Sequence, residues 1–361
     1  MSIGGSVAAV GAGAAAPASI AVWLSPAQLA GQRIVYAYAG LTPPVSLLAA
    51  IRAGQAAGVI FFGPNVSGPA QLRAVIAQLQ RANAQSPVHE PLLMLADQEG
   101  GLVRRLPGAP ALSEKTIGAS AQGATLAAQA GAGAGATLGA VGIDVNLAPV
   151  LDVFRAPGNF IDAYQRSYSS NPTIVTGLGR AFISAQQRTS VAATAKHFPG
   201  LGAAAAAQNT DERPVTIAVS PATLRGVDEA PYSAAIAAGV KLVMVSWAIY
   251  PALDARMPAG LSAAVIGGEL RGRLHFRGVI VSDGLGAGAL ARFGGFASRA
   301  GLAAKAGADL LLCTVPNAND NTPANGVAAL GGVLAATRNG TVSRGAALQS
   351  AARVLALRAN P

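Results

Sequence analysis

Two polar residues end an apolar run near the middle of the chain. Val191 to Ala195 (VAATA) is followed by Lys196 and His197, and the next three residues, Phe198 to Gly200, break regular structure. This layout is typical of a buried strand that presents two polar side chains at its C-terminal tip. A lysine and a histidine in that position can bind a polar ligand or move protons.

A stretch of small residues, Gly200 to Ala207, follows this tip. It leads into Asn209 to Arg213 (NTDER), which carries two carboxylates, Asp211 and Glu212. The stretch is too apolar for a solvated loop and too featureless to pack. We therefore expect a flexible flap that brings these acids over the Lys-His pair, near a ligand only once the ligand is bound.

Several other apolar runs also end in polar residues. They are Asp97-Gln98-Glu99 after PLLMLA, Asp152 after NLAPVL, Ser246-Trp247 after KLVMV and Asp283 after GVIVS. A single aspartate after a strand more often caps a helix or turn than it catalyses a reaction. Capping does not readily explain five runs that end this way. Carboxylates together with Arg and Lys suit a polar, hydroxylated ligand.

The elements that must position these residues alternate regularly. Strands are expected over 33–40, 58–63, 91–96, 142–151, 191–197, 241–246, 278–282 and 308–314, and helices over 44–57, 69–85, 122–140, 172–188, 221–238, 262–274, 298–306, 325–337 and 343–358. The strands are continuous apolar runs, which is typical of parallel strands buried on both faces. Eight such units favour a single (β/α)8 barrel of the α/β class over an open sheet.

A barrel of this kind carries its active site at the C-terminal ends of its strands. The barrel therefore predicts that Asp97, Asp152, Lys196, His197 and Asp283 converge on one mouth.

Composition narrows the function classes. The chain has 361 residues, of which 52% are hydrophobic and 12% charged, and its net charge of +10 comes from scattered basic residues without a basic run. Nucleic-acid binding, which needs clustered positive charge, is therefore disfavoured. The single cysteine, Cys313, lies in the apolar run LLLCT and is expected to be a buried, inert thiol.

The N-terminal residues differ in composition from the rest. Residues 1–22 form a low-complexity leader or linker without the basic region of a secretory signal, and residues 23–361 form the barrel. No stretch is long and apolar enough to predict a membrane span. We expect a monomer, and an extracellular or cell-envelope location over a cytoplasmic one.

Six ordered motifs resemble those of a known family. They are DQEGGLVRRL (97–106), NLAPVLDV (146–153), RSYSSNP (166–172), KHFPGLG (196–202), PALDARMPAGLS (251–262) and GVIVSDGLGAGAL (278–290). From about Leu24 to the end, the chain resembles the N-terminal domain of family 3 glycoside hydrolases, and most closely their single-domain β-N-acetylhexosaminidases.

The resemblance implies a retaining glycosidase that acts on a carbohydrate substrate and needs no cofactor or metal. Asp283 matches the family's nucleophile motif. Positions that line the −1 sugar subsite in the family match Asp97, Arg105, Asp152, Arg166, Lys196 and His197. His197 also has a plainer interpretation as a histidine of the core.

The chain departs from the family pattern where the proton donor should be. Leu201 replaces the second histidine of KHFPGHG, and Asp211-Glu212-Arg213 stands in place of Asp-Ser-His. An arginine cannot give up a proton at working pH. Trp247, which we count among the substrate-binding residues, replaces another family histidine, and we expect no second domain to supply the acid.

Three hypotheses follow. In the first, the protein is an active glycosidase in which Glu212 or Asp211 has become the acid, with its pKa raised when the flap closes. In the second, the barrel binds sugars without catalysis, and Arg213 clamps an anionic or amide-bearing ligand. In the third, the same barrel carries out another reaction.

Overall fold

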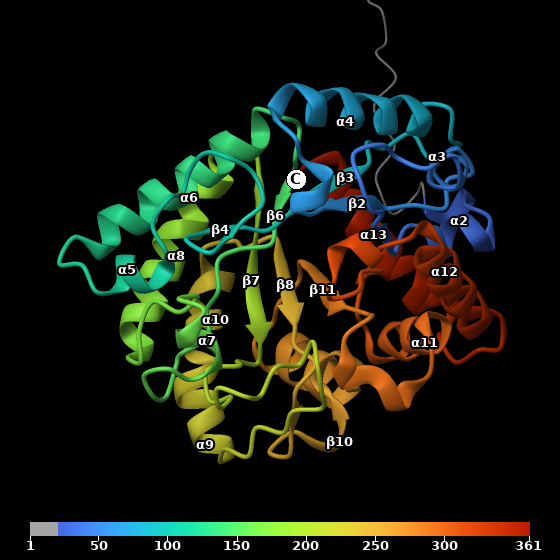
Figure 1. Ribbon diagram of the computed structural model, residues 1–361. Helices are drawn as coiled ribbons and strands as arrows, with labels where there is room; N and C mark the ends of the chain where they lie inside the picture. Colours follow the sequence, from blue (N-terminus) through green and yellow to red (C-terminus); the bar gives the residue numbers. More distant parts are fainter. Residues whose placement is uncertain (1–20) are drawn as a thin grey trace, which may run out of the picture.

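The barrel predicted from the alternation is confirmed. The computed structural model describes residues 21–361, so nearly all of the expected leader lies outside the described residues. Eight parallel strands close in the order β1-β12-β11-β8-β7-β6-β3-β2. Helices surround the strands, and β7, β8 and β11 run side by side through the centre of the view in Figure 1.

The barrel strands are short. They are β1 (Ile34–Tyr36), β2 (Gly58–Phe61), β3 (Leu93–Ala96), β6 (Val145–Asn146), β7 (Ala192–Phe198), β8 (Leu242–Val245), β11 (Val279–Gly284) and β12 (Leu310–Leu312). Successive side chains point to opposite faces. Leu242 and Met244 of β8 pack inside the barrel, whereas Val243 and Val245 pack against the helices. Both faces are buried, which explains why the strands are continuous apolar runs.

The helices form the outer layer. They are α2 (Pro26–Gly31), α3 (Val45–Arg52), α4 (Pro69–Asn83), α5 (Glu114–Gly118), α6 (Gly123–Gly139), α7 (Phe160–Ala163), α8 (Pro172–Gln187), α9 (Pro221–Thr223), α10 (Ala230–Ala237), α11 (Phe296–Ala306), α12 (Pro323–Arg338) and α13 (Arg344–Ala359). Helix α4 illustrates why these segments are helical. Proline stands at its first position, where no backbone N–H is needed, and Leu72, Ile76 and Leu79 form its buried face.

Two expected helices have a different form. The helix expected over 221–238 is divided into α9, the π-helical turn η2 (Leu224–Asp228) and α10. Pro231 has no N–H to donate, so a regular helix cannot run through this position. The helix expected over 262–274 is the π-helical segment η4 (Ala264–Arg273).

Two small hairpins were not expected. They are β4 (Gln98–Gly100) with β5 (Val103–Arg104), and β9 (Ile249–Tyr250) with β10 (Asp254–Pro258). Each follows a barrel strand, β3 or β8, and so lies at the end of the barrel where the polar residues gather. The 3-10 turns η1 (Gly63–Asn65), η3 (Ala259–Leu261), η5 (Gly288–Phe293) and η6 (Ala318–Asp320) complete the connections.

Candidate active site

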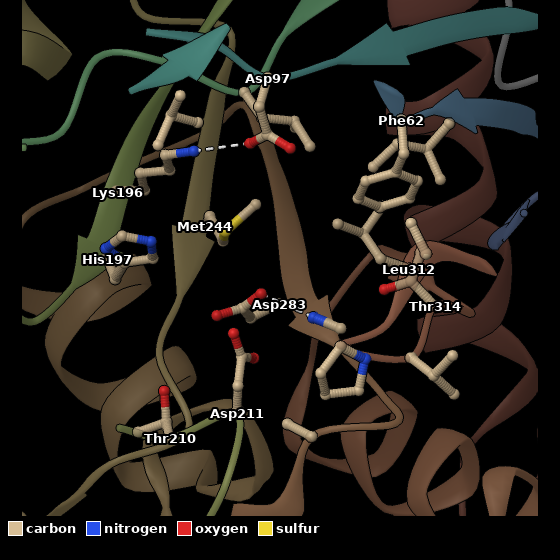
Figure 2. A pocket seen from close by; sticks show the side chains of 18 of the residues that line it. Phe62, Asp97, Lys196, His197, Thr210, Asp211, Met244, Asp283, Leu312 and Thr314 are labelled. Carbon is tan, nitrogen blue, oxygen red and sulfur yellow. Dashed lines mark hydrogen bonds and ion pairs between the residues drawn. The ribbon is translucent and has the colours of Figure 1, made fainter. Parts of the chain in front are cut away.

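A cavity of about 360 Å³ lies at the C-terminal ends of the strands. Its lining includes seven charged or titratable residues, Asp97, Arg105, Arg166, Lys196, His197, Asp211 and Asp283. Figure 2 shows five of them pointing into the same space, with Met244 of the barrel interior between them. The convergence expected of Asp97, Lys196, His197 and Asp283 is therefore what the structure shows.

Buried ion pairs form one side of the cavity. The Lys196 ammonium lies 2.8 Å from the Asp97 carboxylate and 2.6 Å from that of Glu99. Arg166 binds both oxygens of Glu99 at 2.8 and 2.9 Å, and Arg105 lies 3.6 Å from Asp97. Two carboxylates and three cations thus share this side, which we call the paired cluster.

The pairing fixes the ionisation of the paired cluster. Burial acts to raise the pKa of Asp97 and of Glu99, but the nearby cations outweigh it and lower both pKa values. Burial acts to lower the pKa of Lys196, yet Asp97 and Glu99 raise it. All three groups therefore keep their charges at neutral pH.

Two neighbouring side chains fix the orientation of the His197 ring. Its Nδ1 lies 2.8 Å from the buried carboxylate of Asp152, and Nη2 of Arg166 lies 3.3 Å from its Nε2. A guanidinium only donates, so Nε2 accepts and the ring proton is on Nδ1, which donates to Asp152. Asp152 also accepts the Leu201 N–H at 2.7 Å and does not itself line the cavity. It positions the histidine that does.

Asp283 comes from the end of β11, on another side of the cavity. One oxygen accepts the Gly284 N–H at 2.7 Å, which fixes the carboxylate against its own backbone. The carbonyl of Gly284 accepts the indole N–H of Trp247 at 2.9 Å. Trp247 is fully buried, packs where a side chain at Gly260 would stand and is absent from the cavity lining. The structure therefore places it beneath Asp283 and not against a ligand.

Asp211 faces Asp283 across the cavity, and the two carboxylates point toward each other in Figure 2. Burial and then the negative charge of Asp283 raise the pKa of Asp211 to about 6. Two carboxylates this close resist being ionised together, so one of them retains a proton far more readily than an isolated aspartate. We call these residues the facing pair.

Glu212 lies outside this arrangement. Its side chain is 58% exposed and pairs with Arg213, itself 60% exposed, at 3.2 Å. Neither residue lines the cavity. The structure therefore brings one of the two candidate acids to the site and leaves the other at the surface, and Arg213 is not placed to clamp a ligand in the cavity.

The loop that carries Asp211 is better packed than the expected flap. Gly202 accepts hydrogen bonds from Arg155 N and from Asn159 Nδ2, and Leu201 and Ala204 are buried. At its far end Ile217 pairs with Ile249. The expectation that the loop is too featureless to pack is wrong, because small residues allow its backbone to lie directly against neighbouring segments.

The remaining side of the cavity is apolar. Phe62 and Pro64 follow β2, and Leu312, Val315 and Pro316 come from β12 and the loop after it. This wall lies opposite Lys196 and His197 in Figure 2, beyond Asp283. The cavity thus offers charged groups on one side and apolar side chains on the other.

Two buried acids near the site were not predicted from the sequence. Glu99 was noted only as one of three polar residues after β3, although its place two residues from Asp97 could have indicated a shared role. Glu114 is buried on the far side of Glu99, accepts the Val150 N–H at 2.9 Å and has its pKa raised by burial and then by Glu99. Its sequence context, Ser113 followed by a short helix, predicts only a cap.

Residues 21–361 contain neither a metal-binding cluster nor a membrane-spanning helix. In this part of the chain no group of three or more His, Cys, Asp or Glu side chains could hold a metal ion. No helix of the same residues is long and apolar enough to cross a membrane. Cys313 is buried, as expected.

Comparison with known proteins identifies the family. Residues 42–357 match the model of the "Glycosyl hydrolase family 3 N terminal domain". The chain belongs to this glycoside hydrolase family. It shares 45% identity with an "Uncharacterized secreted glycosyl hydrolase" of Arthroderma benhamiae, over 95% of this chain and 96% of that protein.

Two further relatives have more specific names. A "Beta-hexosaminidase" of Xanthomonas oryzae pv. oryzae is 35% identical over 72% of this chain and 77% of that protein. The solved family 3 β-N-acetylglucosaminidase of Paenibacillus sp. str. FPU-7 superposes with a TM-score of 0.85 at 36% identity, covering 92% of this chain. This family 3 chain spans 62% of that longer protein.

Proposed function

We propose that this family 3 protein is a retaining β-glycosidase acting on β-linked N-acetylhexosaminides or related β-glycosides. The facing pair carries the proposal: a cavity-lining carboxylate with a raised pKa faces a second carboxylate at the end of β11. A retaining mechanism uses two such groups about 5 to 5.5 Å apart, one as nucleophile and one as acid and then base.

In the first step Asp283 attacks the anomeric carbon. A bond forms between this carbon and a carboxylate oxygen of Asp283, and the bond to the leaving oxygen breaks while Asp211 donates its proton to that oxygen. With its pKa raised to about 6, Asp211 keeps its proton at mildly acidic pH, where an isolated aspartate is ionised.

In the second step water releases the sugar. Formation of the glycosyl ester removes the negative charge of Asp283, which is the second cause of the raised pKa of Asp211. The proton affinity of Asp211 therefore falls once the ester exists, and the ionised Asp211 takes a proton from the attacking water. One charge thus changes Asp211 from acid to base.

The paired cluster supports the binding role proposed for it. Asp97 accepts hydrogen bonds from sugar hydroxyl groups, and Lys196, Arg105 and Arg166 donate to them as charge-assisted partners. His197 presents Nε2 to the cavity, held in place by Asp152. The two relatives that are named for hexosaminides favour an N-acetylated sugar, and the relative named as secreted favours an extracellular location.

The test compares two β-glycosides with different leaving groups in Asp211→Asn. Loss of the acid should lower kcat/KM by about 10² to 10⁴-fold for an unactivated alkyl or disaccharide substrate. A dinitrophenyl glycoside, whose leaving group needs little protonation, should lose far less. Equal losses for both substrates would show that Asp211 is not the acid, and Glu212→Gln serves as the matched control at the surface.

A second comparison tests the substrate class. Nitrophenyl N-acetyl-β-glucosaminide and nitrophenyl β-glucoside differ only at C2, so the ratio of their kcat/KM values measures the contribution of the acetamido group. A ratio above about 10 supports a hexosaminidase. No turnover of either substrate would favour the sugar-binding alternative.

A further inference from the structure

The loop that carries Asp211 is joined by backbone hydrogen bonds to the segment that follows Asp283. The Gly288 N–H donates to the Asp211 carbonyl at 2.8 Å, and the Ala289 N–H donates to that of Thr210 at 3.0 Å. Two successive donors thus meet two successive acceptors. We call this contact the latch.

The contact at Gly288 leaves no room for a side chain. A Cβ atom at this position would lie 2.2 Å from the Glu212 carbonyl oxygen and 3.0 Å from that of Asp211. Both neighbours are backbone atoms, so they cannot turn aside as a flexible side chain would. Any residue larger than glycine must therefore push the Asp211 loop and the Gly288 segment apart.

The segment on the nucleophile side is itself fixed. Leu285 N–H donates to Leu312 at 2.9 Å, and Gly286 N–H donates to Thr314 at 2.8 Å, which ties the segment to the end of β12. Trp247 holds the Gly284 carbonyl from below. The Asp211 loop therefore rests on a support that also positions Asp283.

The middle of the Asp211 loop has less support of its own. Ala205, Ala206 and Ala207 are exposed, and the turn there is closed by Gln208 through local hydrogen bonds. Asp211 and Glu212 lie beyond this exposed turn, so the latch is the contact that fixes the depth of Asp211 in the cavity.

We propose that Gly288 is a positioning residue for the proton transfer, and that the latch sets the spacing between the acid Asp211 and the nucleophile Asp283. The inference rests on the proposed function, because it assumes that Asp211 is the acid. The latch explains how a loop of small residues can hold Asp211 at a fixed distance from Asp283. The loop is hydrogen-bonded to the segment that follows the nucleophile, and this segment supports it.

The experiment is Gly288→Ala in the full chain, measured with an unactivated β-glycoside and a dinitrophenyl β-glycoside. Displacement of a catalytic group by about 1 Å costs roughly 10²-fold. We expect kcat/KM for the unactivated substrate to fall by about this factor, and that for the activated one to change by less than about 5-fold, since it needs little proton donation. The limb of the pH profile above about pH 6 should also shift, because Asp211 moves relative to Asp283.

Gly295→Ala is the matched control. Gly295 lies in the same connection between β11 and α11, and a Cβ atom there meets nothing within 4 Å. This variant should keep wild-type values for both substrates. Thermal unfolding of both variants checks that the barrel is intact.

The outcomes separate the inference from the proposed function. Unchanged kinetics in Gly288→Ala, or equal loss for both substrates, would overturn the positioning role. Asp211→Asn decides the proposed function independently: leaving-group dependence there without any in Gly288→Ala refutes the latch alone, and no dependence in Asp211→Asn refutes the acid on which the latch depends.

Discussion

The paired cluster and the facing pair lie in one cavity, yet their electrostatics are opposite. In the paired cluster, Asp97 and Glu99 are neutralised by Lys196 and arginines, and their pKa values fall. In the facing pair, desolvation and then the charge of Asp283 raise the pKa of Asp211 to about 6. The difference teaches that neighbouring cations lower the pKa of the carboxylates that bind, whereas a neighbouring carboxylate adds to the rise that lets Asp211 carry a proton.

The strongest test of this contrast is Asp283→Asn. The substitution keeps the size of the side chain but removes the charge needed for the covalent intermediate, so turnover of an aryl glycoside should fall by about 10⁴-fold or more. The affinity for a sugar product should largely persist, because the paired cluster is untouched. Initial rates and calorimetric binding measure the two effects, and unchanged turnover would refute Asp283 as nucleophile.

Removal of a charge from the paired cluster should instead lower the free energy of unfolding. Lys196 is buried and is shared by two carboxylates, so Lys196→Met leaves Glu99 with Arg166 alone and Asp97 with only Arg105, 3.6 Å away. Removal of one partner of a buried ion pair costs about 3 to 5 kcal/mol of unfolding free energy. Urea denaturation measures this loss.

Lys305→Met is the matched control for that variant. Lys305 is an exposed lysine of α11, and its replacement should change the unfolding free energy by less than about 0.5 kcal/mol. Equal effects of the two lysine substitutions would mean that the paired cluster contributes nothing to stability.

Much of this contrast could be read from the sequence, and part of it could not. Buried parallel strands have a strong pattern, and a barrel gathers their C-terminal ends, so Lys196, His197 and Asp283 were correctly placed at one mouth. Side-chain partners carry no comparable pattern. Glu99 pairs with Lys196 and Arg166, which lie far from it in the chain, and no local pattern identifies these partners.

The loop residues show the same limit. Asp211 and Glu212 are adjacent acids with the same local composition, so the sequence left both as candidates for the acid. Their difference arises from the latch, which orients one side chain into the cavity and leaves the other at the surface. Trp247 was expected to touch the substrate because it follows β8. In the structure its indole N–H instead donates to the Gly284 carbonyl.

The pH profile of an unactivated substrate sharpens the comparison further. The acid must be protonated, so kcat/KM should fall as pH rises through the pKa of Asp211, about 6. Asp97 and Glu99 have lowered pKa values and stay ionised over this range, so they should not contribute to that limb. In Asp211→Asn the limb should disappear. If it persists in that variant, Asp211 does not set it.

The smallest effect is expected at the surface pair of Glu212 and Arg213. Both side chains are more than half exposed, and exposed ion pairs contribute about 0 to 1 kcal/mol at most. Glu212→Gln and Arg213→Ala should each leave kcat/KM within about 3-fold of wild type for both leaving groups, because neither side chain lines the cavity.

These two variants also control for closeness in the chain, since Glu212 and Arg213 directly follow Asp211 without lining the cavity. A selective loss with the unactivated substrate in Glu212→Gln would transfer the acid role to Glu212 and require the loop to turn over on binding. A loss of sugar affinity in Arg213→Ala would instead favour the clamp of the sugar-binding alternative. Wild-type behaviour in both leaves the proton with Asp211, because among the acids of this loop it alone faces Asp283.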